Sequence, residues 1–289
     1  MQNVKNRVMQ KIRPFLWFDG KAEEAAKFYT SIFKNSEIRS ISQMSATFQL
    51  DGLEFIALNG GPQFKFSPAT SFFVECERRE ELDAEWKRLS KSGTVLMELA
   101  AYPFSEKFGW VQDEFGVSWQ LNLAGRKQTI TPFLMFVGEQ YGKAEEAMSF
   151  YISLFKNSSV TRIERYGAGE AEAEGTVKHA RFALNGQQFM AMDSGREHPF
   201  TFTPAISFFV SCETQKEIDY FWEKLSAGGE KDRCGWLKDK FELSWQIVPT
   251  VLGELLSDKD AAKAQRVMTA MLKMVKLDIK KLKQAAKQK

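Results

Sequence analysis

The chain has 289 residues, of which 44% are hydrophobic and 27% charged, with 25 phenylalanines and 7 tryptophans available to fill a core. This composition is typical of a globular protein, and the length favours two domains over one. No apolar run approaches the roughly 20 residues that a membrane-spanning helix needs, so we expect no membrane partner.

The net charge of +3 is unevenly distributed. Residues 250–289 carry ten Lys or Arg and four Asp or Glu, so this tail is basic while the rest of the chain is slightly acidic. A basic tail can bind nucleic acid. Because no aromatic interleaving or recognition motif accompanies the charge, a solvated helix face is the favoured interpretation and no nucleic acid is expected.

The beginning of the chain and the cysteines favour a cytoplasmic setting. Residues 1–13 are basic but contain no apolar segment of the kind found in a secretory signal. The three cysteines cannot all pair, and Cys76 and Cys212 fall at equivalent places in strand-like runs. We therefore expect buried free thiols in a reducing compartment.

Two copies of one pattern follow each other along the chain, which predicts two homologous domains. Their offset drifts, as loop insertions would cause. The predicted bounds are 12–125 and 126–250, with an extension at 251–289. The matching segments are IRPFLWF (12–18) with ITPFLMF (130–136), KAEEA (21–25) with KAEEA (143–147), and FSPATSFFV (66–74) with FTPAISFFV (202–210).

Each copy is predicted to contain two units of a strand, a helix and three further strands. In the second copy, apolar residues recur at helical spacing from Ala144 to Phe155. Strands are expected near 160–166, 177–184 and 188–192, with Asn185-Gly186 as the turn of a hairpin.

Each copy ends on a turn that leads into a short strand, DEFGVSWQ (113–120) and DKFELSWQ (239–246). Side chains alternate along a strand, so Trp119 and Trp245 face one way while Gln120 and Gln246 face the other. If the tryptophans pack on helices, both glutamines point into the space that the sheet encloses. Beyond Pro249, an apolar stripe from Met268 to Leu282 predicts one amphipathic helix that docks on the body or on a partner.

This order of elements and the Asp-x-Phe-Gly-x-Ser-Trp-Gln ending resemble the vicinal oxygen chelate superfamily of glyoxalases, bleomycin-resistance proteins and dioxygenases. The match is nearest to the PhnB-like branch, labelled 3-demethylubiquinone-9 3-methyltransferase, and covers residues 12–123 and 130–250. The resemblance implies an α+β fold with two tandem domains. Each would comprise two β-α-β-β-β units forming a curved mixed sheet, with the C-terminal amphipathic helix added.

The resemblance also implies positions for a metal and a cofactor. The superfamily's metal ligands would fall at Arg13, Ala69 and Gln120 in the first copy and at Thr131, Ala205 and Gln246 in the second. Neither set provides two imidazole or carboxylate donors, so we expect no metal. The loops after the first strands contain a single glycine each, so we expect no S-adenosylmethionine cofactor either.

Inward-facing residues of the second copy predict an apolar small-molecule site with a cation, an imidazole and an amide. Arg181 could bind a ligand carboxylate or phosphate, and His179 could orient the ligand or act as a general base. The alternatives are a surface salt bridge for Arg181 and a hydrogen-bonded strand histidine for His179. The predicted ligand-binding residues are Thr131, Phe133, Met135, His179, Arg181, Ser207, Phe209 and Gln246.

The first copy has Ser45 and Thr47 where the second has its ionisable pair. This half is therefore expected either to be mainly structural or to bind a more apolar molecule, in a pocket where Phe15, Trp17 and Gln120 remain. Cys234 is a candidate reactive thiol if nearby cations lower its pKa, and otherwise an ordinary loop cysteine.

Two functions remain open from the sequence. The first is a cytoplasmic, metal-independent small-molecule-binding protein whose paired domains imitate a dimer within one chain, with a homodimer as an open alternative. The second is an enzyme acting on a small carbonyl or quinone-type compound, as an isomerase, a lyase or the methyltransferase of the label. In that case His179 is the candidate catalytic residue, assisted by Arg181. A third possibility is an interaction role for the C-terminal helix.

Overall fold

The computed structural model describes residues 10–288, so most of the basic N-terminal segment lies outside the described residues. Internal contacts divide the chain into two compact units. The larger unit comprises residues 14–207 and 241–244, and the smaller unit comprises residues 10–13, 208–240 and 245–288. Between residues 10 and 288, no helix is both long and apolar enough to cross a membrane.

The larger unit contains an eight-stranded mixed sheet with the strand order β10-β11-β12-β9-β5-β8-β7-β6. Four strands come from the first copy and four from the second, and they join where β5 and β9 pair antiparallel, with Ser71 opposite Phe133. The two copies therefore build one sheet together. Its strands are β5 (Thr70–Cys76), β6 (Thr94–Tyr102), β7 (Ser105–Gln112), β8 (Ser118–Leu123), β9 (Thr129–Phe136), β10 (Ser159–Arg165), β11 (Val177–Leu184) and β12 (Gln187–Asp193).

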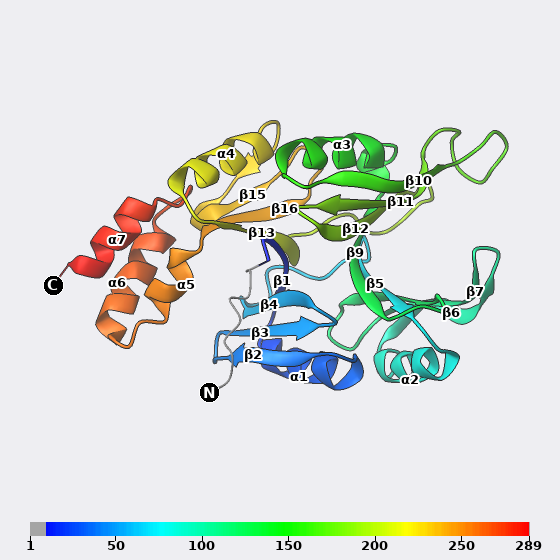
Figure 1. The fold of residues 1–289 in the computed structure, drawn as a ribbon, viewed down its shortest axis with the longest axis horizontal. Coiled ribbons are helices and arrows are strands. Elements are labelled where there is room, and N and C mark those ends of the chain that lie inside the picture. Colours follow the sequence, from blue (N-terminus) through cyan, green and yellow to red (C-terminus); the bar gives the residue numbers. More distant parts are fainter. Residues whose placement is uncertain (1–9, 289) are drawn as a thin grey trace. The chain divides into compact units, whose positions relative to one another are not determined.

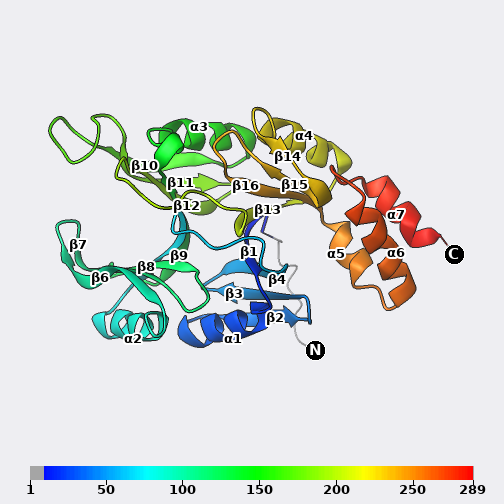
Figure 2. The ribbon, with the colours of Figure 1, turned by 180° about the vertical axis from the view of Figure 1, so that it is seen from behind.

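Helices α2 (Arg79–Leu89) and α3 (Ala144–Leu154) cover one face of this sheet, as both ribbon views show (Figures 1 and 2). The buried residues of α3 include Ala147, Met148 and Tyr151, which recur at helical spacing and so form one apolar stripe against the strands. Side chains alternate between the two faces of a sheet, and the face that these helices do not cover is called the inner face below.

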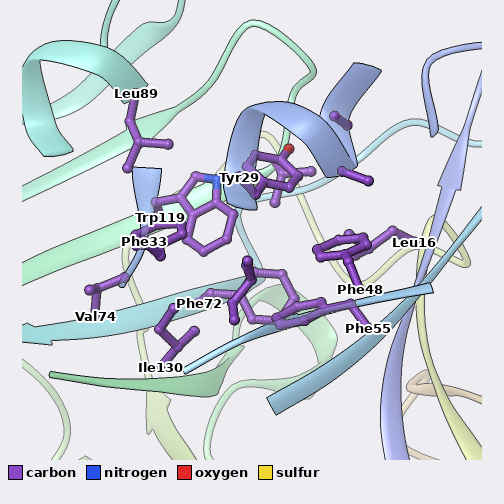
Figure 3. Packing of buried hydrophobic residues seen from close by; sticks show 14 of the residues in the cluster. Leu16, Tyr29, Phe33, Phe48, Phe55, Phe72, Val74, Leu89, Trp119 and Ile130 are labelled. Carbon is purple, nitrogen blue, oxygen red and sulfur yellow. The ribbon is translucent and has the colours of Figure 1, made fainter. Parts of the chain in front are cut away.

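The rest of the larger unit is the first β-α-β-β-β unit of the chain, with its strands in the order β1-β4-β3-β2. Its aromatic core is shared with the helix-covered side of β5 and β8, where Tyr29, Phe72 and Trp119 meet with ring centroids 5.1–5.2 Å apart (Figure 3). Burial of such rings is the main stabilising contribution here. The elements are β1 (Ile12–Phe18), α1 (Ala22–Ile32), β2 (Glu37–Ile41), β3 (Ser45–Leu50) and β4 (Leu53–Asn59).

The Asp-x-Phe-Gly-x-Ser-Trp-Gln motif is a structural node. Asp113 is buried and accepts hydrogen bonds from Tyr29 Oη at 2.7 Å, from Trp119 Nε1 at 2.8 Å and from two backbone amides of its own turn. Burial raises the pKa of Asp113 to about 6, and these hydrogen bonds limit the rise. In the smaller unit Asp239 accepts in the same way from Trp245 Nε1 at 2.8 Å. The motif therefore fixes turns, and in the larger unit Gln120 follows Trp119 as the next inner-face residue.

The smaller unit holds strands in the order β14-β15-β16-β13, with α4 beside them. Helix α4 begins after Thr214, whose hydroxyl accepts from Glu217 N at 3.2 Å as an N-cap. The elements are β13 (Ile206–Cys212), α4 (Gln215–Leu225), β14 (Glu230–Lys231), β15 (Trp236–Lys238) and β16 (Ser244–Pro249).

The C-terminal extension forms three helices rather than the single helix that its apolar stripe predicted: α5 (Val251–Leu256), α6 (Ala261–Leu272) and α7 (Ile279–Lys287). The chain turns between α6 and α7, and Asp278 caps α7 by accepting from Lys281 N at 3.0 Å. Leu272, one of the stripe residues, is 53% exposed as a result. Leu282 is fully buried against the smaller unit.

The α+β fold class and the β-α-β-β-β units are confirmed. The predicted strands of the second copy lie within one residue or so of β10, β11 and β12, and Asn185-Gly186 forms the hairpin turn with both residues at positive φ. Cys76 and Cys212 are buried and free, as expected. The domain bounds at 125 and 250 remain a prediction.

Candidate functional site

The inner face is built by alternation along the strands. Phe73 of β5 stands opposite Gln120 of β8 on one side and Thr131 of β9 on the other. Met190 of β12 stands opposite both Phe133 and Arg181. One surface therefore collects side chains from both copies of the repeat.

Most of this surface is apolar. Aromatic and methionine side chains pack over it as one cluster, with Phe73 and Phe133 stacked at 6.1 Å and an interplanar angle of 21°. A surface rich in rings and flexible thioethers suits flat or apolar ligands. The buried members are Phe73, Phe108, Trp110, Phe133, Met135, Val137 and Met190, and the partly buried members include Met97, Tyr102, Met192 and Phe200.

Two hydrogen-bonded polar pairs lie among these apolar residues. Gln120 Nε2 donates to Ser71 Oγ at 2.9 Å, and Trp110 Nε1 donates to Ser118 Oγ at 2.7 Å. All four side chains are buried. The side chain of Gln120 thus lies on the inner face, where its amide is hydrogen-bonded to Ser71.

Arg181 is bound to a carboxylate of the same chain. Its guanidinium meets Glu75 of β5 at 2.5 Å, and Glu75 also binds Arg126 and Thr129. Burial alone would raise the pKa of Glu75, but the hydrogen bonds from Arg181, Arg126 and Thr129 outweigh it and hold the pKa below its ordinary value. Arg181 therefore forms a partly buried salt bridge with a residue of the other copy, and its role in ligand binding stays a prediction.

His179 is half-buried beside Phe133, with ring centroids 6.2 Å apart. Burial lowers the pKa of His179, and the nearby charge of Arg181 lowers it further. The imidazole is consequently neutral at pH 7 and can accept a proton or a hydrogen bond.

The predicted site residues fall into separate groups. Thr131, Phe133, Met135, His179 and Arg181 share the inner face, but the strands of Ser207, Phe209 and Gln246 (β13 and β16) are not part of that sheet. The sequence predicts one enclosed space for each copy, whereas the observed sheet combines four strands of the first copy with four of the second. The pairing of strands distant in sequence carries no local signal that would have shown this.

In the smaller unit, Phe209 and Val248 pack against the C-terminal helices. Arg13 lies over the Phe209 ring at 4.7 Å and donates to Ser211 Oγ at 3.1 Å. The predicted first-copy pocket is divided as well. Phe15 and Trp17 belong to β1, where Trp17 donates to Gly61 O at 2.9 Å, while Gln120 belongs to the inner face.

Several inner-face residues were missed from the sequence, chiefly Glu75, Phe73 and Trp110. The alternation within SFFVEC would have placed Phe73 and Glu75 on one face, but not beside Arg181 of the other copy. Cys234 has a raised pKa, because burial and Asp232 outweigh the nearby Arg233. The hypothesis of a reactive thiol is therefore not supported.

Comparison with known families gives a clear match. The family described as 3-demethylubiquinone-9 3-methyltransferase matches residues 10–122 and again residues 128–248, which together make up most of the chain. The chain belongs to this family. Its two copies are thus two tandem family domains.

Two solved structures are similar to the chain. A PhnB protein from Bacillus cereus is 49% identical, covering 40% of this chain and all of its own, with a TM-score of 0.39. Glyoxalase I from Zea mays is 12% identical over 81% of this chain and 91% of its own, with a TM-score of 0.53. The second likeness shows that the chain has a glyoxalase I-like fold. No curated protein sequence matches the chain.

The superfamily's divalent metal does not fit the donors at the inner face. The corresponding positions supply the Gln120 amide, the Thr131 hydroxyl and the methyl group of Ala69, and the amide is already bonded to Ser71. No cluster of three His, Cys, Asp or Glu that could hold a metal occurs within residues 10–288. A divalent ion needs several charged or imidazole donors, which this set lacks.

The methyl donor implied by the family's description does not fit the loops after β1 and β9 either. Asn59 Oδ1 accepts from Ala22 N at 2.8 Å at the start of α1. Asp193 Oδ1 accepts from Gly142 N at 2.9 Å and from Ala144 N at 3.1 Å at the start of α3. Side chains of the protein therefore already occupy the helix starts that could cradle a cofactor.

Proposed function

We propose that the protein binds a small, largely apolar organic molecule on the inner face without a metal ion. The single observation that carries this proposal is the cluster of rings and methionines around Phe73 and Phe133, bordered by the neutral imidazole of His179. Such a surface, with few polar groups, is the usual composition of a small-molecule site. It differs from the sequence prediction in drawing on both copies.

The polar groups at this face suggest how a ligand would be oriented. His179 offers a hydrogen-bond acceptor or donor, and Arg181 can share its guanidinium between Glu75 and a ligand oxygen, since five N–H donors are available. We infer that the ligand carries a carbonyl, quinone or carboxylate oxygen. Both copies contribute strands within one chain, so a second copy of the chain is not needed to complete the face.

The test is to measure ligand affinity by calorimetry with a panel of small aromatic and quinone-type compounds. For compounds that bind, His179→Ala should weaken binding about tenfold, the equivalent of one lost hydrogen bond and its packing. Met44→Ala, a change at a residue 58% exposed in another hairpin, is the matched control and should leave affinity unchanged. Equal affinities for both variants would contradict the proposal.

One observation favours catalysis as the second candidate. The lowered pKa of His179 leaves it neutral and able to act as a general base toward a carbonyl compound. Catalysis predicts that His179→Ala abolishes turnover while affinity changes little. If affinity falls and the wild-type protein turns over none of its ligands, the protein is a binding module.

A further inference from the structure

In the larger unit, the carboxylate of Glu172 is hydrogen-bonded to the residues that directly follow β12. Glu172 lies in the loop between β10 and β11, residues 166–176, where the first copy has only residues 42–44 between its equivalent strands. Glu172 Oε2 accepts from Gly195 N at 2.8 Å, and its Oε1 accepts from Ser194 Oγ at 3.4 Å. Most neighbouring loop residues are exposed, whereas Glu172 is partly buried.

Ser194, which donates to this carboxylate, is held in place by contacts that do not involve Glu172. Ser194 is buried, its backbone N donates to Phe136 O at 2.9 Å, and its hydroxyl lies 2.9 Å from His198 Nε2. A Cβ on residue 195 would lie 2.6 Å from Glu172 Oε2 and 2.8 Å from Tyr141 Cζ, so the side chains of Glu172 and Tyr141 would have to move away from residue 195. The hydroxyl of Ser194 and the backbone N–H of Gly195 both donate to the Glu172 carboxylate, so together they form a small anion site.

This anion site adjoins the inner face. The ring of His198 lies 4.8 Å from that of Phe200, and Phe200 lies against Trp110 with centroids 6.4 Å apart. Phe200 belongs to the apolar cluster around Phe73 and Phe133. Phe200 and His198 therefore connect the apolar cluster to Ser194 through side-chain contacts.

We propose that Ser194 Oγ and Gly195 N–H form a carboxylate-binding subsite, which Glu172 fills in the absence of ligand and which a carboxylate of the ligand takes over. This assignment rests on the proposed function, because the rest of the ligand lies on the inner face. The loop of Glu172 is also held by hydrogen bonds from Ala173 N to Tyr141 Oη at 3.0 Å and from Lys178 Nζ to Glu170 Oε1 at 2.7 Å, so the loop stays attached when Glu172 is displaced. The ligand class is thus an aromatic or otherwise apolar monocarboxylate.

The experiment titrates 4-fluorobenzoate into the full chain and follows the fluorine signal together with the imidazole signals. The chain has two histidines, so His179 reports on the inner face and His198 on the subsite. Glu172→Ala removes the internal competitor and should raise affinity about tenfold, the equivalent of roughly one charge-assisted hydrogen bond. Gly195→Ala should reduce affinity by a similar factor, because its Cβ fills the place of the carboxylate.

Two controls separate the possible outcomes. Glu174→Ala removes the same charge from an exposed residue of the same loop and should not change affinity. The neutral 4-fluorobenzamide should show no gain from Glu172→Ala. If Glu172→Ala and Glu174→Ala bind 4-fluorobenzoate equally, the subsite is contradicted. In that case a response of the His179 signals would keep the proposed function, and no response at either histidine would contradict the proposed function as well.

Discussion

Glu85 of α2 is a buried carboxylate whose charge disfavours the folded state. It lies 4% exposed and accepts from Gln128 Nε2 at 2.5 Å and from Cys76 Sγ at 3.3 Å. Burial raises its pKa from 4.5 to about 7, against the effect of these hydrogen bonds. Because the folded pKa is above the unfolded one, the protonated group stabilises the fold fully below pH 4.5, and this contribution is lost as pH rises through 7.

We therefore predict that Glu85→Gln removes a decline in stability between pH 4.5 and pH 7 that the wild type shows. The decline is on the order of 3 kcal/mol, from the size of the pKa shift. Urea unfolding across this pH range measures it, and Glu80→Gln, at an exposed position of the same helix, should behave like the wild type. A variant with the same pH dependence as the wild type would show that Glu85 has an ordinary pKa.

Asp113 gives a second prediction at this scale. Asn in its place keeps the shape but directs an amide N–H₂ at groups that are themselves donors, among them Tyr29 Oη and Trp119 Nε1. Asp113→Asn should lower the free energy of unfolding by about 2 kcal/mol, the cost of unsatisfied buried donors. Glu114→Gln, one residue away and exposed, should change it little. Equal denaturation midpoints for these two variants would contradict the role of Asp113 as a node.

At the scale of elements, β5 of the first copy and β11 of the second are linked by Glu75 and Arg181. Arg181→Ala leaves Glu75 buried with only Arg126 and Thr129, and Arg126 is itself largely exposed. We expect Arg181→Ala to cost about 2 kcal/mol of stability and Arg126→Ala less than about 1 kcal/mol. Chemical denaturation compares them, and a larger loss for Arg126→Ala would contradict this ranking.

The C-terminal helices supply the other element-scale prediction. Leu282 of α7 is fully buried, whereas Leu272 at the end of α6 is 53% exposed, although one apolar stripe contains both. Leu282→Ala should destabilise the smaller unit by about 3 kcal/mol, and Leu272→Ala by less than about 0.5 kcal/mol. Similar losses for both would indicate one continuous helix, as the stripe alone predicted.

These elements show which parts of the fold could be predicted from the sequence. The hairpin of β11 and β12 was predictable because alternation and Asn185-Gly186 are local signals. The break before α7 was missed since the helical spacing continues across it, although Asp278 is a recognisable N-cap. The pairing of β5 with β9 could not be predicted, because it joins residues far apart in sequence. For the same reason the contact between Glu75 and Arg181 could not be predicted.

At the scale of the whole molecule, the duplicated chain gives its two copies different surroundings. The mixed sheet of the larger unit combines half of each copy, and its inner face carries His179 and the apolar cluster. In the smaller unit, the C-terminal helices pack on Phe209 and Val248. Under the proposed function, the inner face binds the ligand, whereas the strands of the smaller unit pack on the C-terminal helices.

The most direct test of metal-independent binding on the inner face is the imidazole spectrum of the chain with a bound ligand, recorded before and after dialysis against a chelator. We predict that the ligand shifts the His179 signals equally in both samples. A ligand-induced shift that disappears with the chelator and returns on addition of zinc or magnesium would contradict the account, as would a bound ligand that leaves His179 unchanged.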